Sequence, residues 1–212
     1  MFRYLIIEGP IGVGKTSMAR LLADAFQARC VLEKPEENPF LPRFYQDPGK
    51  YAFQAQLFFL LSRFQQQREM LQLDLFNQTT LCDYLFAKDR IFASLNLSDQ
   101  ELVLYDQIFR LLHGQIPSPD LVIYLQAKPE VLLHRVRSRN LPYEKGLDLD
   151  YLKKLTEAYN YYFFHYDQTP LLVVNTSEID FVNRKEDLDQ LIREIRQMRQ
   201  GTWYFTPLRS KK

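Results

Sequence analysis

Three of the seven glycines of this 212-residue chain lie within six residues, directly after an apolar run at 4–7 and before a helical pattern at 17–23. The apolar run predicts a buried strand, and the recurring apolar residues predict a helix. The segment between them consists of Gly9, Pro10, Ile11, Gly12, Val13, Gly14, Lys15 and Thr16. A strand that enters a glycine-rich loop and leaves it as a helix constrains the fold more than any other feature of the chain.

A loop of this kind binds phosphate. Its glycines leave backbone N–H groups free to point toward a phosphate, and the helix N-terminus adds about half a positive charge. Lys15 would then reach the β- and γ-phosphates, and the hydroxyl of Thr16 would ligate Mg²⁺. A purely structural turn is the alternative, but such a match directly after a first strand rarely arises by chance. The sequence therefore predicts an ATP or GTP site, and the acceptor has to come from the rest of the chain.

Composition narrows the classes of partner. A chain of 212 residues with 46% hydrophobic and 25% charged residues is expected to form one domain, 1–212. A net charge of +1 gives no basic field for nucleic acid, and no apolar run approaches the roughly 18 residues that cross a membrane. The N-terminus leads straight into the strand and loop, so we expect no signal peptide there. We therefore expect a cytoplasmic protein without nucleic-acid or membrane partners.

Downstream, apolar runs alternate with helical patterns. Further strands are expected at 30–33, 79–83, 120–127 and 171–174, and helices at 51–76, 98–113, 148–166, 185–200 and from 128 to about 137. Strands that alternate with helices predict an α/β fold with a five-stranded parallel sheet flanked by helices, whose ligands bind at the carboxyl ends of the strands. For residues 202–212, a docked and a loose tail are both open.

Glu33 and Asp83 each lie at the end of an expected strand, so both are predicted at the same sheet edge as the phosphate loop. Two carboxylates near a γ-phosphate can divide the work, because one can accept the proton of the attacking hydroxyl while the other holds Mg²⁺ directly or through water. We assign the base to Glu33 and the metal to Asp83, with Thr16 as a further metal ligand. The alternative is that each carboxylate is only a helix cap or a solvated strand end.

Arg135 and Arg139 lie one turn apart on an expected helix that runs into an irregular stretch. Arginines in this position can fold over a transferring phosphoryl group and spread its charge. Arginine clusters also occur as solvated helix faces, and the pattern leaves both interpretations open.

Together these segments resemble the deoxynucleoside kinase family, in particular its bacterial purine deoxynucleoside kinases, over nearly the whole chain. The order and spacing of the segments carry the resemblance, which also includes ENPF at 37–40, FQAQ at 53–56, LSR at 61–63, CDY at 82–84, DRIFA at 89–93, IYLQA at 123–127 and EKG at 144–146. The resemblance implies a P-loop kinase fold with an arginine-bearing lid at about 137–147. It also implies ATP as phosphate donor, Mg²⁺, a deoxynucleoside acceptor and a homodimer.

The resemblance assigns roles to individual residues. Glu33 corresponds to the general base that takes the proton from the 5′-hydroxyl, and Gln56 to the glutamine that makes paired hydrogen bonds to the nucleobase. Gln54 competes for that role, but the seven-residue spacing from Gln56 to Arg63 puts those two on one helix face. Arg63 corresponds to an arginine that acts with a later aspartate, here Asp89, on the edge of the base.

Other positions complete the implied site. Phe59, one turn from Gln56, is the candidate to stack on the base. Tyr45 and Glu144 correspond to the pair that holds the sugar 3′-hydroxyl. The remaining assignments are Lys15, Arg135 and Arg139 over the phosphates, Asp83 near the substrate, and Asp180 and Phe181 in the loop that contacts the adenine of ATP.

Two positions depart from the family pattern. Tyr84 and Leu141 stand where many relatives carry arginine, so a cation near the 5′-hydroxyl and another on the lid are absent. Lys88 or Arg90 is the candidate to compensate for the missing charge.

The expected function is ATP-dependent transfer of the γ-phosphoryl group to the 5′-hydroxyl of a deoxynucleoside. Relatives selective for thymidine tend to lack a charged pair such as Arg63 and Asp89, so its presence favours deoxyadenosine or deoxyguanosine. One alternative is a nucleoside monophosphate kinase of the thymidylate kinase type, which would need a basic residue for the acceptor phosphate where this chain has Glu33. Another is a non-catalytic scaffold, which has no physical need for the intact phosphate-loop and carboxylate residues.

Overall fold

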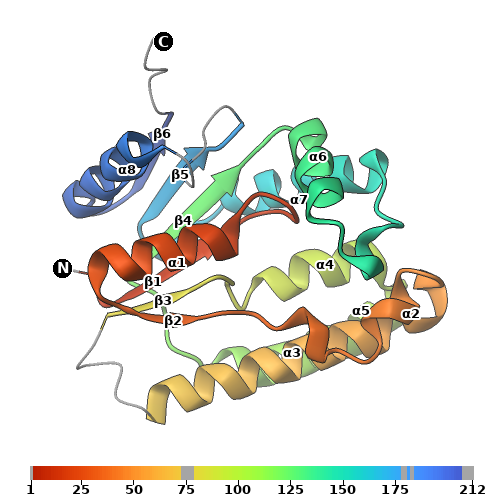
Figure 1. The fold of residues 1–212 in the computed structure, drawn as a ribbon. Helices are drawn as coiled ribbons and strands as arrows, with labels where there is room; N and C mark the ends of the chain where they lie inside the picture. Colours follow the sequence, from red (N-terminus) through yellow and green to blue (C-terminus); the bar gives the residue numbers. More distant parts are fainter. Residues whose placement is uncertain (1, 73–78, 178–180, 182–183, 207–212) are drawn as a thin grey trace.

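The computed structural model describes residues 2–72, 79–177, 181 and 184–206. Its centre is one sheet in the order β2-β3-β1-β4-β5-β6, in which every neighbouring pair is parallel (Figure 1). The strands are β1 (Tyr4–Glu8), β2 (Arg29–Val31), β3 (Thr80–Cys82), β4 (Leu121–Gln126), β5 (Leu171–Asn175) and β6 (Thr202–Phe205). The expected α/β class, with a parallel sheet flanked by helices, is confirmed.

Eight α-helices are found among the described residues: α1 (Lys15–Phe26), α2 (Leu41–Phe44), α3 (Pro48–Gln72), α4 (Lys88–Asn96), α5 (Asp99–His113), α6 (Pro129–Arg139), α7 (Leu149–Phe164) and α8 (Lys185–Gln197). Helix α1 packs against β1, β2 and β3, whereas α3, α4 and α5 contact one another. Figure 1 shows α3 and α5 side by side at the end of the molecule far from α8. In the described part of the chain, no helix has the length and apolar character needed to cross a bilayer.

The sheet has six strands rather than the expected five. Residues Thr202–Phe205 pair in parallel with β5, so the first part of the C-terminal segment is docked as an edge strand. Gly201, with φ of 74°, supplies the left-handed turn before it. Three of the four side chains of β6 are exposed, so the segment lacks the continuous apolar run by which buried strands are recognised. Residues 207–212 lie outside the described residues.

Three helices also differ from expectation. Helix α2 (Leu41–Phe44) lies in a segment where no helix was expected. Helix α4 (Lys88–Asn96) was not expected, because it is short and its pattern was obscured by the buried polar residues Lys88 and Asp89. The helix expected at 51–76 is described as far as Gln72, and the remainder of that segment lies outside the described residues.

Strand register brings the ends of three strands to one place. Ile6 of β1 and Val31 of β2 both align with Cys82 of β3, so the segments that follow these strands emerge at one edge of the sheet. The phosphate loop, Glu33 and Asp83 lie in those segments. Their convergence, which the sequence predicts from strand ends alone, is therefore a consequence of parallel pairing.

Candidate active site

The phosphate loop connects β1 to α1 by passing close to neighbouring backbone. A Cβ atom at Gly9 would lie 2.5 Å from the carbonyl oxygen of Leu125, and one at Gly12 would lie 2.8 Å from that of Leu132. Gly12 also has φ of 83°, which disfavours any residue with a side chain. The two glycines are therefore required for the loop to fit between β4 and α6.

Lys15 bends back over this loop. Its Nζ donates hydrogen bonds to the carbonyl oxygens of Gly9 at 2.7 Å and Pro10 at 3.2 Å. Burial and, after it, the nearby charge of Lys88 outweigh the carboxylates around Lys15 and lower its pKa to about 8. Lys15 is thus a desolvated cation at the position where a loop-bound phosphate would lie, which strengthens its pull on negative charge.

Asp83 joins the start of α1 to the segment after β2. Its Oδ2 accepts a 2.6 Å hydrogen bond from the hydroxyl of Thr16, and its Oδ1 accepts one of 2.6 Å from the backbone N–H of Glu33. Burial raises the pKa of Asp83, while the hydrogen bond from Thr16 opposes that shift. A hydroxyl and a carboxylate side by side are the oxygen donors that Mg²⁺ prefers.

The small number of protein oxygens near the loop also fits magnesium. Among the described residues, no cluster of three or more His, Cys, Asp or Glu side chains could enclose a metal ion. Mg²⁺ bound with a nucleotide needs only one or two protein oxygens, because phosphate oxygens and water complete its octahedron. Thr16 and Asp83 are consistent with that mode.

Glu33 is held by two cations. Its Oε1 accepts hydrogen bonds from Nε of Arg63 at 2.8 Å and from Nη2 of the same side chain, and its Oε2 accepts one of 2.8 Å from Nζ of Lys88. Burial raises the pKa of Glu33, but Arg63 and Lys88 outweigh burial and hold the pKa well below its usual range. Glu33 is therefore an ionised carboxylate whose orientation is fixed on both oxygens.

Arg63 also contacts the residues assigned to the nucleobase. Its Nη1 lies 2.5 Å from Oδ1 of Asp89, which is fully buried. Its guanidinium lies over the ring of Phe59, with 4.9 Å between Cζ and the ring centroid. Burial raises the pKa of Asp89 to about 6, although Arg63 opposes the shift. One side chain thus connects Glu33, Asp89 and Phe59.

Gln56 lies on the same face of α3 as Arg63 and is 4% exposed, whereas Gln54 is exposed to solvent. Within the described part of the chain, the buried Oε1 of Gln56 accepts no hydrogen bond. A buried acceptor without a partner is costly unless a ligand supplies a donor. Gln56, rather than Gln54, therefore has the geometry of a ligand-binding amide.

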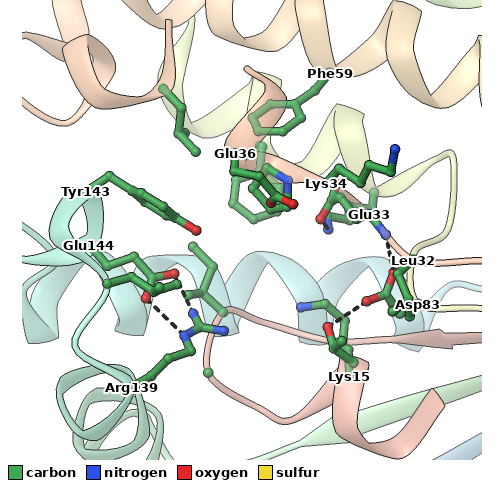
Figure 2. Close-up of a pocket in the computed structure, with 18 of the residues that line it drawn as sticks. Lys15, Leu32, Glu33, Lys34, Glu36, Phe59, Asp83, Arg139, Tyr143 and Glu144 are labelled. Atoms are coloured by element: carbon green, nitrogen blue, oxygen red, sulfur yellow. Dashed lines mark hydrogen bonds and ion pairs between the residues drawn. The ribbon is translucent and has the colours of Figure 1, made fainter. Parts of the chain in front are cut away.

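The lid residues lie across the cavity from Glu33. Arg139 pairs with Glu144, with 3.2 Å between Nε and Oε2 and a second, shorter contact through Nη2. Tyr45 stacks on Tyr143 with ring centroids 6.3 Å apart. Figure 2 shows Arg139, Tyr143 and Glu144 on one side of the pocket and Glu33, Asp83 and Lys15 on the other. A ligand between these two sides would contact both.

A cavity of about 640 Å³ includes both groups. Its lining contains most of the predicted site residues, namely Ile11, Gly12, Gly14, Lys15, Thr16, Glu33, Tyr45, Gln56, Phe59, Arg63, Asp83, Arg139 and Glu144. This volume is in the range of pockets for small organic ligands. Leu141 also lines the cavity, so the lid presents an apolar side chain at that position.

Arg135 does not share the position of Arg139. It donates hydrogen bonds to the carbonyl oxygen of Val13 at 3.3 Å and to both Oγ1 and the carbonyl oxygen of Thr176. It lines a neighbouring cavity of about 360 Å³ together with Arg139 and Phe181. Arg135 thus ties the phosphate loop to the segment after β5. Asp180 lies outside the described residues.

Sequence reasoning missed Glu8. This fully buried carboxylate accepts hydrogen bonds of 2.7 Å from the backbone N–H groups of Gly9 and Leu85, and one of 3.1 Å from the hydroxyl of Tyr159. It therefore anchors both the phosphate loop and the segment before α4. A carboxylate at the end of an otherwise apolar central strand was the available signal.

A phosphate loop at one end of a cavity and a cation-held carboxylate facing it define the class of protein, a phosphotransferase that acts on a hydroxyl. The family model for deoxynucleoside kinase matches residues 5–199. The chain therefore belongs to the deoxynucleoside kinase family, and the predicted family and enzyme class are confirmed.

Similar proteins agree with this assignment. The chain is 32% identical over 200 residues to deoxyguanosine kinase from Bacillus subtilis (strain 168), covering 92% of this chain and 97% of that protein. It is 35% identical over 194 residues to deoxyadenosine kinase from Dictyostelium discoideum, covering 90% and 78%. A solved structure of deoxyadenosine kinase from M. mycoides with bound dATP has a TM-score of 0.78 and 22% identity, covering 91% of this chain and 98% of that chain. That likeness supports the fold.

Proposed function

We propose that this deoxynucleoside kinase transfers the γ-phosphoryl group of ATP to the 5′-hydroxyl of deoxyguanosine or deoxyadenosine. The contact that carries the proposal is the Arg63 guanidinium, which lines the cavity and joins Glu33, near the phosphate loop, to the buried Asp89 behind the cavity wall. A nucleoside would place its base beside Gln56, Phe59 and Arg63 and its sugar toward Glu33, all of which line the one cavity. The names of the relatives, which include deoxyguanosine and deoxyadenosine kinases, favour a purine.

The acceptor would lie with its base toward Gln56, Phe59 and Asp89 and its 3′-hydroxyl toward Tyr45 and Glu144. The unsatisfied Oε1 of Gln56 supports this orientation, because it awaits a donor such as a base N–H. A carboxylate at the sugar 3′ position is also a natural acceptor for a hydroxyl. This orientation points the 5′-hydroxyl toward Glu33.

In the proposed reaction, the 5′-oxygen attacks the γ-phosphorus of ATP, the bond to the β-phosphate breaks, and Glu33 takes the hydroxyl proton. A low pKa makes Glu33 a weak base, which suits a loose transition state in which the proton leaves late. Lys15 neutralises charge on the phosphates, and Arg139 is positioned to do so from the lid. Arg135 supports the loop through Val13.

We propose that Thr16 and Asp83 hold Mg²⁺ together with the nucleotide. When bound, the ion would neutralise phosphate charge and orient the leaving group. Thr16 lies in the first turn of α1, directly after the loop, and Asp83 orients its hydroxyl.

A homodimer is part of the proposal. Side chains on the adjacent helices α3 and α5 leave large apolar groups in solvent: Leu61, Leu71, Val103, Leu104 and Leu111. Exposed apolar side chains on two helices that contact each other would be covered in a dimer interface. Light scattering tests this proposal, with a dimer expected for the wild type and a monomer for Leu111→Glu.

A cytoplasmic location remains a prediction from the sequence, and cell fractionation tests it.

The decisive experiment measures ADP release with deoxyguanosine, deoxyadenosine, deoxycytidine and thymidine, and with dGMP and dTMP as phosphorylated acceptors. We expect the highest kcat/KM for a purine deoxynucleoside and no turnover of the monophosphates. Because the phosphate loop could bind either ATP or GTP, each should also be compared as donor. A preference for thymidine or for a monophosphate would overturn the proposed substrate.

A further inference from the structure

The side chain of Lys88, which ends in an ammonium group, is buried at the start of α4. It is 4% exposed, and its Nζ lies 2.8 Å from Oε2 of Glu33. It also lies over the ring of Phe92, 5.8 Å from the centroid. Burying a lysine is costly unless its charge is compensated. Glu33 provides that compensation, so the two side chains form one unit.

The other candidate cation is excluded by its position. Arg90, two residues further along α4, has 60% of its side chain exposed and pairs with Asp106 of α5. Tyr84 is fully buried, and its ring lies against the guanidinium of Arg63, 5.9 Å from Cζ. Tyr84 brings no charge to Glu33. Among the residues that the structure describes, the cations that pair with the Glu33 carboxylate are thus Lys88 and Arg63.

These two cations hold different oxygens. Arg63 binds Oε1 and is itself fixed by Asp89, which is fully buried behind the cavity wall. Lys88 binds Oε2 and lines the same cavity as Lys15, whose pKa is lowered by burial and then by the charge of Lys88. The orientation of Oε2 therefore depends on Lys88.

We propose that Lys88 is a positioning residue that holds the Glu33 carboxylate toward the 5′-hydroxyl of the acceptor. This inference rests on the proposed role of Glu33 as the base. Lys88 takes no proton from the acceptor and binds neither base nor sugar. Its loss should therefore slow the chemical step while leaving deoxynucleoside affinity nearly intact, since a misplacement of about 1 Å can cost about 10²-fold in rate.

The test compares Lys88→Met, Lys88→Arg and the control Arg90→Met in two backgrounds, wild type and Glu33→Gln. In the wild-type background, we expect Lys88→Met to lower kcat about 10²-fold with KM for the deoxynucleoside changed less than about threefold. Lys88→Arg, which keeps the cation, should recover most of the rate. Arg90→Met should leave kcat unchanged.

The Glu33→Gln background separates a positioning role from an independent one. If Lys88 acts through Glu33, Lys88→Met should add less than about threefold to the loss already caused by Glu33→Gln. Additive losses would overturn the inference and make Lys88 an independent phosphate-binding cation. Loss of rate in Arg90→Met equal to that in Lys88→Met would also overturn it, because helix packing would then be the cause.

The experiment needs separate controls for folding and for activity. Lys88→Met leaves Glu33 with one partner fewer, so its thermal unfolding is compared with that of Lys88→Gln, which keeps a neutral donor. If Lys88→Met does not fold, Lys88→Gln is used in its place. An unchanged kcat in folded Lys88→Gln overturns the inference. A loss of kcat in Lys88→Gln that is not seen in Lys88→Arg supports it. A wild type that turns over no deoxynucleoside would overturn the proposed function, whereas an active wild type with an equally active Lys88→Met would overturn only the role of Lys88.

Discussion

One carboxylate oxygen of Glu33 accepts two hydrogen bonds from the guanidinium of Arg63, thirty residues later in the chain. The remaining nitrogen of that guanidinium pairs with Asp89. In the proposed mechanism, the side chain that faces the nucleobase thus also fixes the proton acceptor at the 5′-hydroxyl. Base recognition and catalysis should therefore not be separable at Arg63.

Arg63→Met is expected to lower both stability and activity. Removal of the guanidinium leaves the fully buried Asp89 and the largely buried Glu33 with fewer partners, which costs roughly 3–5 kcal/mol in free energy of unfolding. Loss of the contact with Glu33 should lower kcat, and loss of the contact with the base should raise KM. Urea denaturation and steady-state kinetics measure these effects, with Arg68→Met, an exposed arginine on the same helix, as control. A selective rise in KM with kcat intact would show that Arg63 serves the base alone.

Glu33→Gln is expected to keep deoxynucleoside binding and lose about 10²–10⁴-fold in kcat. Glutamine has the size of glutamate and retains hydrogen bonding, but it cannot take the proton. Isothermal titration with the deoxynucleoside and single-turnover kinetics separate the two effects. Weak binding with a normal rate would instead make Glu33 a binding residue, and Asp83 would become the candidate base.

The pKa of Lys15, lowered to about 8, predicts a pH dependence for ATP. Lys15 is charged below that pH and becomes neutral as the pH rises through it. Because kcat/KM reports on the free enzyme, its value for ATP should fall about tenfold per unit above about pH 8. Bound phosphates favour the charged form, so kcat should persist to higher pH.

Lys15→Ala provides the control for that profile. It should lose about 10²–10³-fold or more in rate at neutral pH, since a cation at the transferring group is removed, and its remaining activity should lack the limb near pH 8. An unchanged limb in Lys15→Ala would assign the titration to another group.

Metal removal tests Thr16 and Asp83. Turnover should stop in EDTA and return on addition of Mg²⁺. Asp83→Asn should raise the Mg²⁺ concentration for half-maximal rate about 10–100-fold, because the carboxylate that orients Thr16 is neutralised. Asp150→Asn, a change at an exposed carboxylate, is the matched control. Equal Mg²⁺ requirements in the two variants would remove Asp83 from the metal site.

The sequence predicts those parts of the site that follow from strand ends. A glycine-rich loop after β1 and carboxylates after β2 and β3 must meet at one edge once the strands are parallel, so Lys15, Glu33 and Asp83 could be brought together without coordinates. Helical spacing likewise puts Gln56 and Arg63 on one face.

The sequence pattern does not predict contacts that depend on the direction of a side chain. Arg135 and Arg139 are one turn apart, yet Arg135 turns to Thr176 and Arg139 to Glu144. The choice between Lys88 and Arg90 required the orientation of α4, which buries one and exposes the other. Spacing along a helix identifies a shared face but not the partner that each side chain reaches.

Removing both members of the Arg63–Asp89 pair should change which base is accepted. Arg63→Met with Asp89→Ala leaves no orphaned charge between these positions, so stability should recover much of what Arg63→Met alone loses. Without the charged pair, the base end of the cavity becomes more apolar, which disfavours a purine edge that needs both a donor and an acceptor and favours the methyl group of thymidine.

Because Lys88 still holds Oε2 of Glu33, the double variant should retain measurable turnover. We therefore expect kcat/KM to fall for deoxyguanosine and deoxyadenosine and to rise relative to them for thymidine. The comparison uses four deoxynucleosides on wild type, Arg63→Met and the double variant. A double variant whose order of preference equals that of wild type would remove Arg63 and Asp89 from base recognition, and their pairing would then serve only to hold Glu33.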